Sequence, residues 1–394
     1  MTMPEDFKPF NSEGAWRATI IDGGDDFITL RSTVEGSGSD NVQQTGVKSI
    51  EGAGEHPIDF WIDFKGTIPE GATPRCAIVR VRYHNYTCEH DIFVRQGYAP
   101  ITINGNAESN NNPAWTSYNV YRFDANNAPV YTKSPLEEGS LFRRGNRTAI
   151  LASNNDRSGF TFGVEPTGSF NVLEFGSATT SQKTWSQLAP STDDVTNRFK
   201  EWSIAGDHER IATIEDFYTL ESTSIHSNIN KAYGVLYGDG ATETQKSVKE
   251  AFGYDHNEDP TNSKKGMRGC FVFNVNNSRN IFFPIGKSGY GRRKGMTSNG
   301  EKVGTLRYAQ RTDYYNNDGT GNIQYVPLFY DLFERPGAIY QCRNRLESTN
   351  NEVKNSSAFD INYFTMGFEG FENGASNNNN GSDSDACFIR TVKY

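Results

Sequence analysis

A chain of 394 residues is too long for one ordinary hydrophobic core, so its length predicts two domains. The aromatic content of 13% and the 38 glycines exclude a disordered chain and a helical bundle, and they favour many short strands joined by polar loops. A formal charge of -9 argues against nucleic acid as a partner, and no stretch is apolar enough for a transmembrane span. Residues 1–6 carry no signal peptide, so the protein is either made without one or shown here without its leader.

The first hundred residues alternate between apolar and polar positions, as β-strands do. The last two strands, 75–83 and 87–96, predict a hairpin that closes at His84 and Asn85. That turn sets Val81 opposite Cys88, Ala77 opposite Ile92 and Arg80 against Glu89. Cys76 then lies opposite Phe93, which argues against a disulfide between Cys76 and Cys88. Earlier strands are predicted over 16–20, 27–30 and 58–62.

These features resemble a BACON-type domain, a small immunoglobulin-like sandwich. The resemblance is carried by Trp16, the strand 75–81 and the closing strand 92–96. It implies an all-β domain that serves either as a spacer or as a ligand binder. We therefore expect a first domain over residues 1–99 and a second over residues 100–394.

The second domain opens with the polar stretch 104–113, which suits a linker or an exposed first loop. Short helices are expected over 193–202, 213–220 and 242–252, the second with an N-capping Thr213 and acids in its first turn. Strands are expected over 270–273, 280–283, 338–340, 359–361 and 388–392.

Motifs for catalysis or cofactor binding are weak in this sequence. The run 285–288 resembles the end of a phosphate-binding loop, but Ile281 stands where that motif needs glycine, so a turn is expected. Asp383 and Asp385 could bind calcium, although a solvated loop is the simpler interpretation. The six histidines are scattered. No metal, cofactor or catalytic residue is therefore predicted.

Tyrosines alternate with Asn and Arg in the last third of the chain, a combination favoured in binding loops and sugar-stacking sites. The alternative is that half of these rings pack beneath long loops. The predicted ligand-binding residues are Tyr314, Tyr315, Tyr325, Tyr340, Arg343, Asn344, Asn362 and Tyr363.

The second domain resembles the FISUMP and formylglycine-generating-enzyme-like branch of the C-type-lectin fold. Residues 209–217 are similar to its Arg-apolar-Pro-Thr-x-x-Glu-aromatic motif, with Ala212 in place of the proline. Further similarity lies in 139–145, 280–284, 304–308, 337–340 and 388–393. The resemblance implies an α+β C-type-lectin-like domain. The family's oxidases use two closely spaced cysteines, whereas Cys270, Cys342 and Cys387 are far apart, and the motifs of calcium-dependent lectins are missing.

The fold class expected is an all-β immunoglobulin-like sandwich followed by an α+β C-type-lectin-like domain. The function expected is non-enzymatic binding or adhesion at the cell surface or outside the cell, with a glycan or protein receptor as partner. Three alternatives stay open: a fimbrial or other surface-assembly subunit, a receptor-binding protein diversified by a retroelement around residues 373–380, and a divergent enzyme that uses Cys270, Cys342 or a carboxylate pair.

Overall fold

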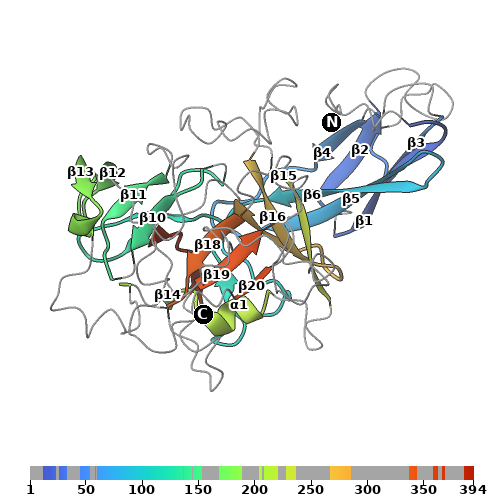
Figure 1. The fold of residues 1–394 in the computed structure, drawn as a ribbon. Helices are drawn as coiled ribbons and strands as arrows, with labels where there is room; N and C mark the ends of the chain where they lie inside the picture. The colour runs from blue at the N-terminus through green and yellow to red at the C-terminus, as the bar shows by residue number, and fades with distance from the viewer. Residues whose placement is uncertain are drawn as a thin grey trace, which may run out of the picture.

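The computed structural model describes residues 12–23, 26–32, 45–53, 58, 60–135, 137–143, 145–152, 168–188, 204–205, 208–220, 228–236, 267–284, 337–343, 358–362, 366–368 and 386–394. These residues form mostly β-strands in several sheets, with almost no helix, which is compatible with an all-β class. Figure 1 shows the N-terminal strands at one end and β10–β13 at the other.

The N-terminal part consists of two antiparallel sheets around one apolar core. The larger sheet has the order β3-β1-β5-β6 and the smaller is the pair β2-β4. The strands are β1 (Trp16–Asp22), β2 (Ile28–Ser32), β3 (Ser49–Gly52), β4 (Phe60–Phe64), β5 (Arg75–Tyr83) and β6 (Cys88–Gln96). Alternation along β5 and β4 directs Ala77, Val79 and Phe60 into the shared core around Trp16. Both sheets therefore bury the same cluster.

The predicted β5–β6 hairpin is present, but its predicted register is wrong by two residues. Tyr83, not Val81, lies opposite Cys88, and Ala77 lies opposite Val94. Arg80 lies opposite Asp91, although its guanidinium also reaches Glu89 diagonally at 2.9 Å. A shift of two residues leaves every side chain on its predicted face.

The cause of the shift is the turn, which spans residues 84–87 in place of the two residues expected. His84, Asn85 and Tyr86 all have positive φ, at 51°, 54° and 66°. Such a run of left-handed residues is costly, and no glycine marks it, although His and Asn adopt this backbone more readily than most residues. Cys76 lies opposite Arg95 and, as expected, forms no disulfide with Cys88.

The second part of the chain contributes the remaining sheets. A five-stranded sheet has the order β13-β12-β11-β10-β21, three three-stranded sheets have the orders β14-β22-β7, β15-β16-β17 and β18-β19-β20, and β8 pairs with β9. The strands are β7 (Ala114–Trp115), β8 (Val120–Phe123), β9 (Pro129–Tyr131), β10 (Ser140–Arg143), β11 (Ala149–Leu151), β12 (Ser169–Leu173), β13 (Thr180–Thr184), β14 (Glu209–Ile211), β15 (Ile229–Leu236), β16 (Met267–Asn274), β17 (Asn280–Pro284), β18 (Gly337–Gln341), β19 (Ala358–Asn362), β20 (Met366–Phe368), β21 (Ala386–Cys387) and β22 (Thr391–Lys393).

Several predicted elements are confirmed here. The strands expected over 270–273, 280–283, 338–340 and 359–361 lie within β16, β17, β18 and β19. The helix expected over 213–220 is α1 (Ile214–Tyr218), and a single 3₁₀ turn spans Ser186–Leu188. The strand expected over 388–392 forms only as a bridge at Phe388 and as β22. The helices expected over 193–202 and 242–252 lie outside the described residues.

Aromatic rings fill the main core of the second part. The Trp115 ring lies 5.0 Å from Phe217 and 5.9 Å from Phe283, and Phe283 meets Tyr340 edge-on at 5.4 Å. These residues come from β7, α1, β17 and β18. The core therefore joins segments that are far apart in the sequence.

Arg390 crosses this core as a fully buried cation. Its guanidinium donates to Asn119 Oδ1 at 2.8 Å, to the Thr116 carbonyl at 2.9 Å and to the Phe282 carbonyl at 3.2 Å. It also lies over the Phe283 ring at 4.8 Å. Among the described residues its hydrogen-bond acceptors are neutral, so hydrogen bonds and an aromatic face, not a carboxylate, hold the charge.

Contacts cross the boundary predicted near residue 100. Arg95 at the end of β6 donates to the carbonyls of Gly97, Ala99 and Asn280 and to Ser117 Oγ, at 2.8 to 3.0 Å. The Phe93 ring stacks on Phe271 of β16 at 5.0 Å. We call the Arg95 and Phe93 contacts the junction. They attach the N-terminal part firmly to the second part.

Candidate functional site

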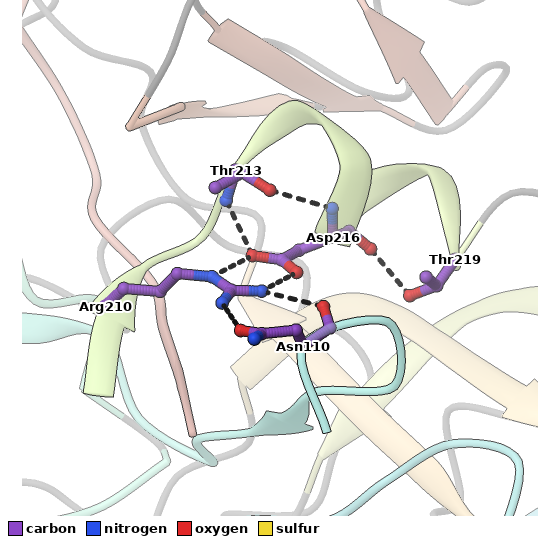
Figure 2. Close-up of polar contacts among 5 residues, drawn as sticks. All are labelled: Asn110, Arg210, Thr213, Asp216 and Thr219. Carbon is purple, nitrogen blue, oxygen red and sulfur yellow. Dashed lines mark hydrogen bonds and ion pairs between the residues drawn. The ribbon is translucent and has the colours of Figure 1, made fainter. Parts of the chain in front are cut away.

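The motif 209–217 builds the N-terminus of α1. Thr213 is the N-cap, and its Oγ1 accepts a hydrogen bond from the Asp216 N–H at 3.1 Å. Asp216 Oδ2 in turn accepts from the Thr213 N–H at 2.8 Å, which completes a capping box. Thr219 donates to the Asp216 carbonyl at 2.6 Å, as Figure 2 shows. The Thr-x-x-acid spacing thus fixes where the helix begins.

Arg210 and Asp216 form a bidentate ion pair beneath this turn. The two bonds measure 3.1 Å (Nε to Oδ2) and 2.7 Å (Nη2 to Oδ1), and the two side chains are only 10% and 2% exposed. Arg210 also donates to the side chain and carbonyl of Asn110 (Figure 2), and its guanidinium lies 4.3 Å from the Tyr394 ring centroid. Burial lowers the pKa of Arg210, but the bonds to Asp216 and its charge outweigh it, so the pKa is raised.

Glu209 belongs to a second polar group on the same strand. Thr391 donates to its Oε1 at 2.9 Å, and the Tyr131 hydroxyl donates to the same oxygen. Lys393 lies opposite Glu209 across the β14–β22 pair. Burial raises the pKa of Glu209, while Thr391 and Lys393 partly oppose this. Glu209 therefore holds its proton more firmly than an exposed glutamate.

The structure places Tyr340 in the core. The ring is fully buried, its hydroxyl accepts from Asn119 Nδ2 at 3.2 Å, and burial raises its pKa. A buried ring offers no face to a ligand. The expectation that half of the tyrosines pack inside applies to Tyr340, and its selection as a stacking residue is wrong in this conformation.

Arg343 and Asn362 lie at opposite ends of the β18–β19 pair. Asn362 is paired with Gly337 at one end, whereas Arg343 follows Gln341, which is paired with Ala358 at the other. Four strand steps separate the two ends, a distance of about 13 Å. Arg343 and Asn362 therefore lie at different ends of this pair of strands. Tyr314, Tyr315, Tyr325, Asn344 and Tyr363 lie outside the described residues.

The cysteines are poorly placed for nucleophilic chemistry. Cys76, Cys270, Cys342 and Cys387 are buried and form no disulfides. Burial raises the pKa of Cys76, which disfavours its thiolate. Within the described ranges, no group of three or more His, Cys, Asp or Glu side chains could hold a metal ion. The 285–288 run and the Asp383–Asp385 pair lie outside those ranges.

Arg343, one of the predicted residues, is half-buried and lies beside α1. Its backbone N–H donates to the Ala212 carbonyl at 2.9 Å, between Arg210 and Thr213 in the sequence. Exposed residues around the same helix are Asn110, Glu215 and Tyr218. We call Asn110, Glu215, Tyr218 and Arg343 the α1 rim. It combines an amide, a carboxylate, a phenol ring and a guanidinium on a base fixed by the Arg210–Asp216 pair.

Sequence reasoning missed three of these four residues. Ile214 and Phe217, three residues apart, face the core, and Glu215 and Tyr218 repeat that spacing on the exposed side. The helical period could therefore have identified them. Asn110 could not be found in this way, because its place depends on a contact with Arg210, a hundred residues away.

Comparisons with known proteins found no matching family model, no matching curated protein and no matching solved structure. In the part of the chain that the structure describes, no helix is both long and apolar enough to cross a membrane.

Proposed function

We propose that this is a non-enzymatic binding protein of the cell surface or extracellular space. Its N-terminal part is an immunoglobulin-like sandwich, and its second part is a C-type-lectin-like head that recognises a glycan or protein receptor. The α1 rim and the polar, tyrosine-rich segments that follow β17 and β18 in the sequence make the contact. Docking depends on complementary shape, with aromatic faces and hydrogen-bonding side chains fixing the orientation.

The observation that carries this proposal is the placement of polar residues around α1, some bonded to one another and others exposed. Two ionisable side chains of the 209–217 motif, Arg210 and Asp216, bond one another, and Thr213 caps the helix that carries Asp216. The thiols of Cys270 and Cys342 are buried. What reaches the surface around α1 is a set of groups suited to docking, and this supports binding over catalysis.

The test is a glycan-array screen of the full chain, because the junction makes an isolated head an unsafe substitute. Tyr218→Ala and Arg343→Ala should each lower selective binding about tenfold or more. Tyr121→Ala is the matched control, since Tyr121 is 36% exposed and Tyr218 38%. Chelation of calcium should leave binding unchanged. Thermal melts of each variant confirm that the fold is kept.

Asn362→Ala distinguishes the two ends of the β18–β19 pair. Binding lost in Asn362→Ala and kept in Arg343→Ala would move the site away from the α1 rim. Absence of selective binding across the array would contradict a glycan receptor and leave a protein receptor as the candidate.

A further inference from the structure

The turn of the β5–β6 hairpin is held by a short segment that precedes β1. Residues 12–15 lie beside the turn, and we call them the strap. β1 and the hairpin belong to one sheet at the N-terminal end of the molecule (Figure 1). The left-handed backbone of His84, Asn85 and Tyr86 is costly for residues other than glycine, and it persists only where the surroundings enforce it. The contacts with the strap are what enforce it here.

Asn85 joins the turn to the strap by three hydrogen bonds. Its N–H donates to the Ala15 carbonyl and its Oδ1 accepts from the Ala15 N–H, both at 3.0 Å. Its Nδ2 donates to the Glu13 carbonyl at 3.3 Å. Gly14 has a φ of 92°, and a Cβ atom there would lie 2.3 Å from Asn85 Oδ1. Strap and turn therefore fit together only while residue 14 has no side chain.

His84 joins the turn to the strap through both its backbone and its ring. The backbone N–H donates to Ser12 Oγ at 2.8 Å, and Ser12 in turn donates to the Gly14 carbonyl at 2.6 Å. The ring Nδ1 accepts from the Glu13 N–H at 2.8 Å. An imidazole nitrogen can accept a hydrogen bond only when it carries no proton. The bond from Glu13 therefore requires the neutral form of His84, with its proton on Nε2.

Protonation of His84 would turn this contact into a repulsive one. Both nitrogens of an imidazolium carry a proton, so Nδ1–H would face the Glu13 N–H, and two donors cannot bond each other. We propose that the strap and the turn form a pH-sensitive latch, which is closed when His84 is neutral and open when it is protonated. Opening moves the strap off the hairpin and lets residues 84–86 leave the left-handed conformation, which relieves its cost.

The groups around His84 leave histidine as the side chain that responds to mild acid. The Tyr83 ring lies 4.9 Å from the imidazole, and Arg17 of β1 lies over Tyr86 and pairs with Glu51 of β3. The other ionisable groups of the strap and of the neighbouring end of β6 are Glu13, Cys88, Glu89 and His90. Carboxylate, phenol and guanidinium groups ordinarily keep their charge state between about pH 5 and pH 7.5, whereas imidazole changes its own in that range.

The latch belongs to the N-terminal part and shares no residue with the α1 rim. The proposal gives the N-terminal part a response to acid and does not depend on what the second part binds.

The test is amide hydrogen exchange of the full chain at about pH 7.5 and about pH 5, the range in which imidazole titrates. Rates at each pH are divided by those of unprotected amides, which gives a protection factor. The amides of residues 13–15 and 84–85 should lose about tenfold in protection at the lower pH, because opening frees the bonds that hold them. The amides of β12 should keep their protection, which shows that the rest of the fold is intact.

Three variants separate the latch from a general effect of acid. His84→Asn keeps a side-chain acceptor on a residue that tolerates positive φ, so its protection should change less than about twofold between the two pH values. His90→Gln is the matched control on the other histidine of the hairpin, and it should keep the tenfold loss. Gly14→Ala should hold the latch open, with low protection at both pH values, because its Cβ meets Asn85. Melting curves will verify that each variant folds.

The proposal is overturned if the natural chain keeps its protection at residues 13–15 and 84–85 in acid. It is also overturned if His84→Asn loses protection as the natural chain does, if His90→Gln abolishes the response, or if β12 loses protection in parallel. None of these measurements involves a receptor, so this test and the test of the head can fail separately.

Discussion

The two parts of the molecule bury different kinds of residues. In the described N-terminal part the buried positions are apolar apart from Ser12, and Arg31 and Arg80 pair with Asp63 and Asp91 where water reaches both groups. The second part buries Asn119, Glu138, Arg143, Arg210, Asp216, Asn274, Asn280, Gln341 and Arg390. Imperfect packing in an apolar core costs less stability than a buried polar group without a partner, because each unpaired group carries its full desolvation cost. The second part should therefore be the more sensitive to single polar substitutions.

The comparison is sharpest for one ion-pair geometry that occurs in both parts. Arg80 and Asp91 form a bidentate pair at 2.8 and 3.0 Å with side chains 29% and 22% exposed. Arg210 and Asp216 form the same pair at 3.1 and 2.7 Å with side chains 10% and 2% exposed. The bonds are alike and the surroundings differ, so substitutions here isolate the effect of burial.

The largest effect is expected for Arg390→Met. Removing the guanidinium leaves the acceptors on Asn119, Thr116 and Phe282 without a donor in the core. We expect the free energy of unfolding to fall by about 4 kcal/mol, measured by urea denaturation of the full chain. The exposed Lys393→Met should change it by less than about 1 kcal/mol. A loss below about 1 kcal/mol for Arg390→Met would show that hydrogen bonds do not hold this core together.

Asp216→Ala should follow, with a loss of about 3 kcal/mol. The substitution leaves the largely buried Arg210 guanidinium without its carboxylate partner and removes one half of the capping box. Glu215→Ala is the control on the same helix, because its side chain is exposed. Equal stability of the two variants in urea would mean that the pair contributes nothing beyond a surface residue.

The pair in the N-terminal part should matter far less. A double-mutant cycle of Arg80→Ala and Asp91→Ala should give an interaction energy of about 0.5 kcal/mol, because water screens both groups. The corresponding cycle on Arg210 and Asp216 should exceed it several-fold. Similar values from the two cycles would remove the distinction between the two parts.

The smallest effect concerns Glu209 and depends on pH. Its pKa is raised in the folded state, so the unfolded chain releases this proton first as pH rises. Its contribution to stability is therefore fully present below the ordinary pKa of glutamate, about 4.3, and falls as pH rises towards the folded pKa. Glu209→Gln should gain stability relative to the natural chain between about pH 4 and pH 7, measured in parallel urea titrations. A difference in unfolding free energy between Glu209→Gln and the natural chain that shrinks as pH rises would contradict the raised pKa.

Local elements of this fold follow from the sequence where local chemistry decides them. Thr213 and the acids after it predicted α1, and the apolar runs 270–273 and 280–283 predicted β16 and β17. The β5–β6 hairpin was predicted as well. Its register was not, because three consecutive left-handed residues are a property of the folded turn, which no Gly or Asn-Gly pair announced.

The site was harder to predict, because burial depends on distant partners. Tyr340 and Arg390 carry the residue types of an exposed binding site, yet contacts with Asn119 bring both into the core. The sequence placed Trp61 in a strand. Because Phe60 points inward, alternation along that strand predicts an exposed Trp61 side chain, as the structure has it. The resemblances to the two families and the boundary near residue 100 stay predictions.

The junction also has a mechanical consequence. Arg95 bonds two oxygens beyond residue 100, on Ser117 and Asn280, and Phe93 stacks on Phe271, so these contacts between the two parts lie close together and bear a pulling force in parallel. Bonds that share a load in parallel resist force better than bonds that open one after another. If the second part binds a receptor as proposed, a pulling force on that receptor would be transmitted to the N-terminal strands with little extension of the chain between them.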